Sequence, residues 1–488
     1  MKFASFYQEY LNQLAAFKLA LETISYEQYT IAPEKGIPYS NKILGILSKN
    51  QFEYENNKEI ITKLESYVSS LSGLEKKEVS LRLKKLLDQQ SLPSSTYSEY
   101  VDLINDSMMI WHKAKSENNY DLFKPYLKQV IEKKKEVLSY SKRYNGSNLY
   151  DLCLDEYEPG MNQEKYDLFF DRIKTKLLPI IPKQAKGTHL FDKNIDITRQ
   201  QQFMNILCDF LKIDFSEIRM DTTEHPFTSS FSNHDTRITT HFYEDNVMSA
   251  IFSTIHEYGH ALYGLQIDDE FMDTMFYEPY CAAHESQSRL MENHIGRSTS
   301  FWKALYPKFI EVFDEFKDVS FDEFMDAICT SECSFIRTEA DELTYPIHIL
   351  IRYEIEKKLL NGTVDYDHLN ELWNDKYEQY LGIRPENDSQ GILQDIHWSS
   401  GDFGYFPSYA LGSAYAAQLY HAMSKEINVD EALENGHIEV IKDWLKMNVH
   451  HYGASKSMEE IVEEVCHEPF NPDYYIDYLI DKYVSKRS

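Results

Sequence analysis

The spacing of apolar residues constrains this chain more than any other feature of its sequence. In segments 6–24, 74–89, 126–144 and 165–181, apolar residues recur every three or four positions, which places them on one face of an α-helix. The turn signals between such segments are short, and no linker, repeat or low-complexity tract interrupts them. The sequence therefore predicts one large, mainly α-helical domain over residues 1–488.

Residues 235–243, DTRITTHFY, break the helical pattern. Arg237, Thr239 and His241 share one side of an alternating segment that is rich in β-branched and aromatic residues. We expect a strand here, in a small β-sheet directly before a helix over 246–266. Such a strand would offer an extended peptide an edge along which to pair.

The charge balance limits the partners of the chain. It has 50 basic and 79 acidic residues, a net charge of −29, which excludes nucleic acid and anionic membranes as electrostatic partners. No run of about 18 apolar residues predicts a membrane span, and the N-terminus lacks the apolar core of a secretory signal. The six cysteines are scattered without a CxxC pair, which is typical of reduced thiols. We therefore expect a cytoplasmic protein.

The segment HEYGH, residues 256–260, carries the clearest chemistry. In a helix, His256 and His260 lie one turn apart on the same face, so both imidazoles can reach one metal ion. Glu257 follows the first histidine and could take a proton from a bound water. In a chain with 17 histidines such a pair also arises by chance. The glutamate between them favours a hydrolytic metal site, because a structural histidine pair has no need of it.

A hydrolytic zinc site needs a third protein ligand and one open position. Glu285, in HESQSR, is the candidate and is expected on the next long helix. His284 is its rival, and since adjacent helical side chains point about 100° apart, one helix rarely presents both. Arg289 lies one turn beyond Glu285 and could pair with its carboxylate. From the residues alone, Glu285 is either a ligand or part of an ordinary salt-bridged face.

Several segments together resemble the carboxypeptidase Taq family of zinc metallocarboxypeptidases. Tyr26, Gly264 and Met291 depart from the family pattern, but none of them replaces an expected ligand. The similar segments are HPF at 225–227, DTRIT at 235–239, HEYGH at 256–260, HESQSR at 284–289, GILQDIHW at 391–398, IRTEADELTY at 336–345, FGYFPSYALG at 403–412 and the segment 30–47. The resemblance therefore runs nearly end to end.

The resemblance implies that His256, His260 and Glu285 bind one zinc or cobalt ion and that Glu257 is the general base. It also implies a large helical body with a deep active-site groove, an active-site core at about 221–412, and commonly a homodimer. The implied reaction is the release of single C-terminal amino acids from peptides with a free C-terminus.

The charge that develops on the attacked carbonyl needs a hydrogen-bond donor besides the ion. His397 can donate from its imidazole and Tyr409 from its hydroxyl, and Tyr405 in the preceding loop is the alternative to Tyr409. We expect Ser408 to cap a helix that Tyr409 begins. These assignments rest partly on the resemblance, because any of the 36 tyrosines can serve packing alone.

A carboxypeptidase must also hold the free α-carboxylate of its substrate, and arginine binds carboxylates through two parallel hydrogen bonds. Arg337 is the first candidate and Arg237 the second, although Arg337 could instead pair with the acids at 339, 341 and 342. Arg352 is expected to form surface or helix pairs. The resemblance suggests that His225, in a turn before Pro226, lines the site; on its own it could equally be a structural histidine.

Three functions are compatible with these residues. The first is a metallocarboxypeptidase that releases single residues. The second is an oligopeptidase or dipeptidyl carboxypeptidase with the same zinc chemistry, in which the carboxylate-binding arginine lies one residue farther from the metal. The third is a catalytically silent peptide-binding or scaffold protein. Glu257 argues against the third, because a binder has no use for a general base.

Overall fold

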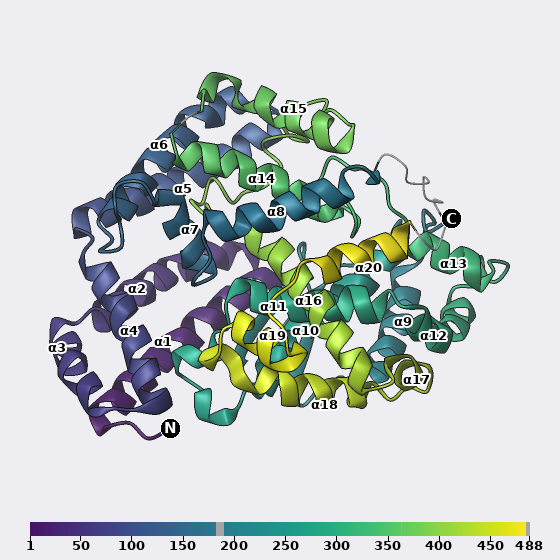
Figure 1. Cartoon of the computed structure of the whole chain (residues 1–488), viewed down its shortest axis with the longest axis horizontal. Helices are drawn as coiled ribbons and strands as arrows, with labels where there is room; N and C mark the ends of the chain where they lie inside the picture. The colour runs from purple at the N-terminus through teal and green to yellow at the C-terminus, as the bar shows by residue number, and fades with distance from the viewer. Residues whose placement is uncertain (182–189, 363, 485–488) are drawn as a thin grey trace.

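The computed structural model describes residues 1–181, 190–362 and 364–484. Within these residues the chain forms twenty α-helices and one three-stranded sheet (Figure 1), so the predicted mainly α-helical fold with a small sheet is confirmed. The helices are α1 Ser5–Thr30, α2 Ile37–Glu55, α3 Lys58–Tyr67, α4 Gly73–Gln90, α5 Ser94–Ser116, α6 Tyr120–Ser139, α7 Leu149–Tyr157, α8 Gln163–Leu177, α9 Ile197–Phe210, α10 Val247–Gln266, α11 Cys281–Arg289, α12 Thr299–Val312, α13 Phe321–Ile328, α14 Tyr345–Leu360, α15 Leu369–Leu381, α16 Phe406–Glu426, α17 Val429–Glu434, α18 Ile438–Asn448, α19 Met458–Cys466 and α20 Asp473–Tyr483.

The four segments with helical spacing coincide with α1, α4, α6 and α8, and their apolar faces are buried. The helix predicted over 246–266 is α10. It begins where the Asn246 side chain accepts a hydrogen bond from the backbone N–H of Ser249, which satisfies one of the free donors of the first turn.

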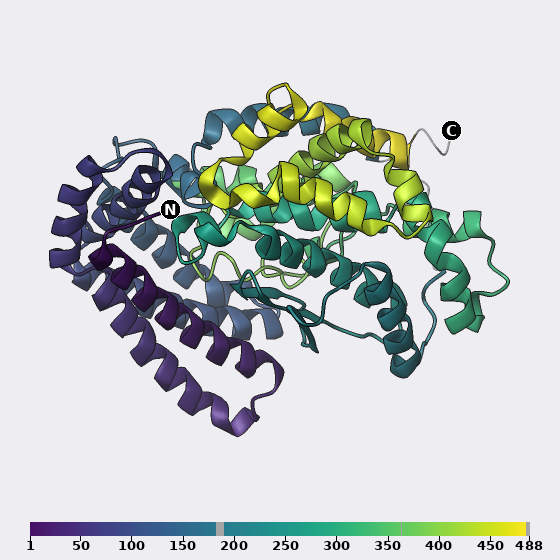
Figure 2. The ribbon, with the colours of Figure 1, turned by 90° about the horizontal axis from the view of Figure 1, so that it is seen from below.

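Buried apolar side chains form two clusters. The larger one extends from α5 to α20, and the smaller one holds α1 against α3 and α4. In Figure 2 this N-terminal group lies at one end of the molecule, with α1 and α2 projecting as a hairpin. Tyr26 connects the hairpin to the sheet, because its hydroxyl donates to Asp221 Oδ2 at 2.6 Å. This hydrogen bond gives a physical role to the tyrosine that departs from the family pattern.

The sheet consists of β1 Ile218–Thr222, β2 Thr228–Ser232 and β3 Asp235–Thr240. The strand predicted in DTRITTHFY is β3, and it occupies the centre of the sheet, parallel to β1 and antiparallel to β2. The prediction that a peptide pairs along it is therefore wrong, because both of its edges are already hydrogen-bonded. β2 is an edge strand of this sheet, and it packs against α10.

Two glycines allow the central helices to approach one another closely. A Cβ atom added to Gly259 of α10 would lie 2.6 Å from Ser288 Cα of α11. A Cβ atom added to Gly412 of α16 would lie 2.7 Å from Glu285 Cβ of α11. Any larger residue at these two positions would have to push the helices apart, because such distances are shorter than atomic contact allows. The glycines therefore fix α10, α11 and α16 at close range.

α16 begins at Phe406, with Tyr405 at the N-cap and Pro407 in the first turn. Ser408 is buried inside the helix, so its predicted capping role is wrong. The reason is the proline, whose fixed φ favours the first turn of a helix and starts it earlier than the serine suggested. Tyr409 still lies near the beginning of the helix.

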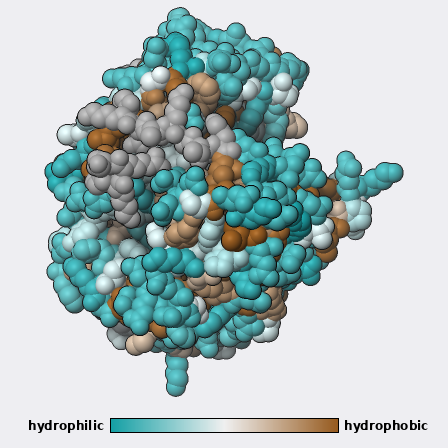
Figure 3. All heavy atoms as spheres, turned by 90° about the vertical axis from the view of Figure 1, so that its right-hand side faces the viewer, coloured by the Kyte–Doolittle hydropathy of each residue, from teal (hydrophilic) through white to brown (hydrophobic). Residues whose placement is uncertain are grey.

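One face of the described chain shows a largely polar surface (Figure 3). Figure 3 shows a mainly hydrophilic face over α12 and α13 with small hydrophobic patches. No helix within residues 1–181, 190–362 and 364–484 is long and apolar enough to cross a membrane.

Candidate metal centre

α10 brings the two histidines of HEYGH together. Its apolar side chains are buried in the larger cluster, and His256 and His260 face away from that core on adjacent turns. Their ring centroids lie 5.0 Å apart. Each side chain keeps slightly under one fifth of its surface exposed, so both can meet a ligand from the solvent side.

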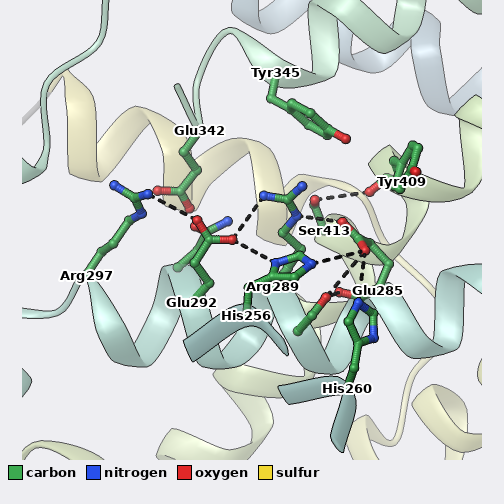
Figure 4. A network of polar contacts seen from close by, with 12 residues as sticks. His256, His260, Glu285, Arg289, Glu292, Arg297, Glu342, Tyr345, Tyr409 and Ser413 are labelled. Carbon is green, nitrogen blue, oxygen red and sulfur yellow. Dashed lines mark hydrogen bonds and ion pairs between the residues drawn. The ribbon is translucent and has the colours of Figure 1, made fainter. Parts of the chain in front are cut away.

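Glu285 of α11 faces both imidazoles (Figure 4). Its Oε2 atom lies 3.8 Å from His256 Nε2 and 3.7 Å from His260 Nε2. One ligand atom from each of these residues lies within 4.8 Å of the other two. His284 lines the cavity in front of these residues, but its ring packs against the Tyr263 ring, with the ring centroids 5.0 Å apart. The three residues singled out in the sequence thus form a donor set of two imidazoles and one carboxylate, which fits a divalent ion such as zinc.

The charges around this set are closely paired. Arg289 Nε donates to Glu285 Oε1 at 2.7 Å, as its position one turn away predicted, and leaves Oε2 facing the histidines. Glu292 Oε2 lies 2.9 Å from His256 Nδ1. The sequence argument overlooked Glu292, which lies beyond α11 in the π-helical segment Leu290–Gly296, where α-helical spacing does not predict the face of a side chain.

Burial and the neighbouring imidazole of His256 lower the pKa of His260 well below its ordinary value, so His260 is neutral and keeps a lone pair. Burial also opposes protonation of His256, but its hydrogen bond to Glu292 and the charge of Glu285 raise its pKa on balance. Binding of a cation to His256 would therefore compete with its protonation.

Glu257 lies beside this donor set and is 8% exposed. Its Oε2 atom accepts a hydrogen bond of 2.6 Å from Thr228 Oγ1, at the start of β2. Burial raises the pKa of Glu257, although His256 and Thr228 oppose the shift. Thr228 was not identified from the sequence; the signal available was its place directly after HPF.

A cavity of about 470 Å³ lies in front of these residues. The cavity is lined by β2 and the loop before it, by α10, and by the starts of α11 and α16. Tyr405 at the N-cap of α16 and Tyr409 in its first turns are part of this lining. The Tyr409 ring meets Tyr405 edge-on at 5.1 Å. The predicted groove thus contains both tyrosines together with His256, Glu257, His260 and Glu285.

His397 lies behind the tyrosines and does not line the cavity. The centroid of its ring lies 5.4 Å from that of Tyr405 and 4.5 Å from that of Phe406. Burial lowers the pKa of His397 to about 4, so the imidazole is neutral near pH 7. Its Nδ1 atom is buried and has no hydrogen-bond partner within the described chain.

Arg337 is buried and contacts Asp395 rather than the nearby acids at 339, 341 and 342. Its Nη2 lies 2.9 Å from Asp395 Oδ1, and its Nη1 donates to the Tyr345 hydroxyl at 3.1 Å. Arg352 is completely buried and reaches Asp395 Oδ2 at 2.6 Å. The prediction of surface or helix pairs for Arg352 is therefore wrong, because a carboxylate distant in sequence compensates its charge inside the core.

Neither of the two remaining candidates lines the cavity. Arg237 donates from Nε to Asp235 Oδ1 at 3.1 Å and from Nη2 to Asp235 Oδ2 at 3.0 Å. Its guanidinium carbon lies 4.1 Å from the centroid of the Phe231 ring. His225 is exposed in the loop before β2, although the next two residues of that loop line the cavity.

Comparison with known proteins adds independent findings. The family model of carboxypeptidase Taq (M32) metallopeptidases matches residues 6–483. Carboxypeptidase 1 of Bacillus subtilis is 39% identical over 464 residues, 93% of this chain and 92% of that protein. Thermostable carboxypeptidase 1 of Thermus thermophilus is 32% identical over 90% of each chain. The crystal structure of an M32 carboxypeptidase from Deinococcus radiodurans R1 is 28% identical, with a TM-score of 0.93 over 98% of each chain.

Proposed function

This chain belongs to the carboxypeptidase Taq (M32) family of metallopeptidases, and from this premise we propose that it releases single C-terminal amino acids from peptides. The observation that carries the proposal is the convergence of His256, His260 and Glu285 beside Glu257 in one cavity. Together these residues meet the two needs of metal-assisted hydrolysis, a site for an ion and a base for water.

His256, His260 and Glu285 hold the ion in this proposal. Zinc is the first choice and cobalt the second, because imidazole and carboxylate donors suit both metals. When bound, such an ion lowers the pKa of water and polarises a peptide carbonyl. Support comes from one ligand atom of each of these three residues, which lie within 4.8 Å of one another.

Glu257 acts as the general base. It takes a proton from the attacking water and passes it to the leaving amine when the peptide bond breaks. Its raised pKa supports the first step, because a carboxylate with a higher pKa is a stronger base and takes a proton from water more readily than an ordinary carboxylate. The Thr228 hydroxyl holds one carboxylate oxygen and thereby orients the other.

Tyr409 donates a hydrogen bond to the carbonyl oxygen as negative charge develops on it, with Tyr405 as the alternative donor and His397 as a further one. The place of both tyrosines in the cavity wall supports this assignment. For His397 the support is a neutral ring with an unpartnered Nδ1 atom next to Tyr405.

Arg337 binds the α-carboxylate of the substrate, and Arg237 is the second candidate for this role. The Arg337 guanidinium lies 5.2 Å from the Tyr409 ring centroid, just behind the wall of the cavity. His225 contributes at the rim, next to the loop residues that line the cavity. The edge of β2, rather than β3, pairs with the extended substrate.

We further propose a single domain over 1–488 with its active-site core at about 221–412, a homodimer, and a cytoplasmic location. The six free cysteines support a reducing compartment. Light scattering of the purified protein measures the oligomeric state directly.

The test of the function is incubation of a short peptide with the metal-loaded enzyme, with and without a chelator, followed by mass spectrometry. Stepwise loss of single C-terminal residues that the chelator abolishes is the expected result. Loss of paired residues or internal cleavage would instead favour a dipeptidyl carboxypeptidase or an oligopeptidase with the same chemistry. Cleavage that the chelator leaves unchanged would contradict both.

A further inference from the structure

α11 passes directly into a π-helical segment, Leu290–Gly296. π-helical turns are rare and occur frequently at functional sites. This segment carries Glu292, which is 9% exposed. Figure 4 shows the ring of His256 between the carboxylates of Glu292 and Glu285.

The contacts of Glu292 determine which nitrogen of His256 carries a proton. Glu292 Oε2 lies 2.9 Å from His256 Nδ1. An ionised carboxylate can only accept, so His256 Nδ1 must donate. In the neutral imidazole the lone pair then lies on Nε2, the atom that faces Glu285 Oε2 at 3.8 Å.

Two arginines fix the carboxylate of Glu292 in turn. Arg289 Nη1 donates to its Oε2 atom at 3.2 Å, and Arg297 Nη2 donates to its Oε1 atom at 3.1 Å. Arg289 also donates to Glu285 Oε1, so its planar guanidinium sets the spacing of the two carboxylates. The guanidinium of Arg297 lies over the Phe252 ring of α10 at 3.8 Å. Rotation of the Glu292 side chain would break all of its contacts at once.

The two histidines differ in this respect. Among the described residues, His260 makes no ion pair with any carboxylate other than Glu285. His260 instead has a hydrogen bond with the backbone of His284, so His256 is the one of the two whose tautomer and ring orientation a carboxylate selects.

We propose that Glu292 is a positioning residue, which holds His256 in the tautomer and orientation that bind a divalent ion and thereby sets the affinity of the site. The proposal rests on the proposed function, in which His256, His260 and Glu285 are the ligands. Carboxylates that accept the second N–H of a metal-bound histidine commonly contribute about 10- to 100-fold to affinity or activity.

The competing interpretation is a structural ion network that stabilises the fold alone. Glu342 provides a matched control, because it is also buried and accepts from Lys482 and from the Tyr483 hydroxyl, each at 2.8 Å. In Figure 4, Glu342 lies on the side of Glu292 that is away from His260. Both glutamates interact electrostatically with Arg297, but of the two only Glu292 contacts His256.

The experiment compares Glu292→Gln, Glu342→Gln and His260→Ala with the wild-type chain. Zn²⁺ affinity is measured on metal-free protein by competition with a chelating dye, the melting temperature of the metal-free form reports folding, and the absorption spectrum of bound Co²⁺ reports ligand geometry. We expect Glu292→Gln to weaken Zn²⁺ binding about 10- to 100-fold and to change the Co²⁺ spectrum. Glu342→Gln should lower the melting temperature without either change.

Equal effects of Glu292→Gln and Glu342→Gln on Zn²⁺ affinity, or no effect of either, would overturn the proposal. If Glu292→Gln does not fold, Glu292→Asp replaces it. Its shorter side chain withdraws the carboxylate from His256, so unchanged affinity in Glu292→Asp would overturn the proposal as well. Wild-type affinity in His260→Ala would refute the proposed ligand set itself, so failure of the inference and failure of the function are distinguishable.

Discussion

At the scale of single residues, the site combines groups that an H-E-x-x-H motif predicts with groups that it does not mention. The motif places His256 and His260 on one face of a helix, because that spacing is a local property of the backbone. It does not reveal that a hydroxyl on β2, that of Thr228, holds Glu257. Nor does it reveal that Arg337 and Arg352 share Asp395.

Glu257→Gln is expected to keep metal binding and to lower kcat by about 10²- to 10⁴-fold, because the amide cannot accept a proton from water. Metal content and peptide hydrolysis are measured on the same preparation. Thr228→Val, which removes only the hydroxyl donor, should reduce kcat less. Undiminished activity in Glu257→Gln would refute its role as the base.

Arg337→Ala is expected to raise KM about 10- to 100-fold for peptides with a free C-terminus and to affect amidated peptides much less. The reason is that a hydrogen bond to a charged group contributes about 1.5–3 kcal/mol. Arg352→Ala is the control, since it disturbs the same buried Asp395 ion pair. If both variants impair both kinds of peptide equally, Arg337 serves only the fold.

At the scale of elements, the centre depends on how closely three helices pack. α10 supplies the histidines, α11 supplies Glu285, and α16 brings Tyr409 to the cavity. Gly259 and Gly412 occupy the two points of closest approach. The glycine within HEYGH thus has a packing role that the metal-binding interpretation of the motif did not include.

Gly412→Ala is expected to destabilise the protein by about 1–3 kcal/mol and to weaken Zn²⁺ binding, since the new methyl group would collide with the Glu285 side chain. Thermal unfolding and Zn²⁺ titration measure the two effects. Gly45→Ala is the control: Gly45 lies in α2, its Cβ would meet nothing within 4 Å, and the change should be neutral or stabilising by up to about 1 kcal/mol. Wild-type melting and metal affinity in Gly412→Ala would show that the helices tolerate separation.

At the scale of the whole molecule, buried carboxyl groups connect segments that are distant in the sequence to the site through hydrogen bonds. Glu356 of α14 accepts from Trp398 Nε1 at 2.8 Å and from the backbone N–H of Gly404 at 2.9 Å, so it anchors the loop between His397 and α16. Glu158, just after α7, accepts from the backbone N–H of Ala282 at 3.1 Å, at the start of α11. These contacts connect segments that are far apart in the sequence.

The contribution of Glu158 to the stability of the fold is expected to fall as the pH rises from about 5 to 8. Burial raises the pKa of Glu158 from 4.5 to about 8, so in this range the folded state holds a proton that the unfolded state has released. Because the folded state binds more protons, unfolding becomes easier with increasing pH. Each pKa unit corresponds to about 1.4 kcal/mol, so the loss is on the order of a few kcal/mol.

Glu158→Gln should flatten this dependence, because the amide does not titrate and can still accept from Ala282. Melting temperatures of metal-free wild type and variant between pH 5 and pH 8.5 provide the comparison. Identical pH profiles for the two proteins would exclude Glu158 as the cause.

The sequence by itself determined the helical class of the fold, the strand before α10, and the residues whose ligand atoms converge in the cavity. Helical spacing and the face shared by His256 and His260 are local properties. Glu285 was singled out as a ligand by the resemblance to the carboxypeptidase Taq family, because from the residues alone it could equally belong to a salt-bridged face. Only the tertiary structure decided that β3 is central, that Asp395 compensates two arginines, and that Glu292 supports His256. These contacts join different elements or follow a π-helical turn, and they depend on how whole helices pack, which no local spacing encodes.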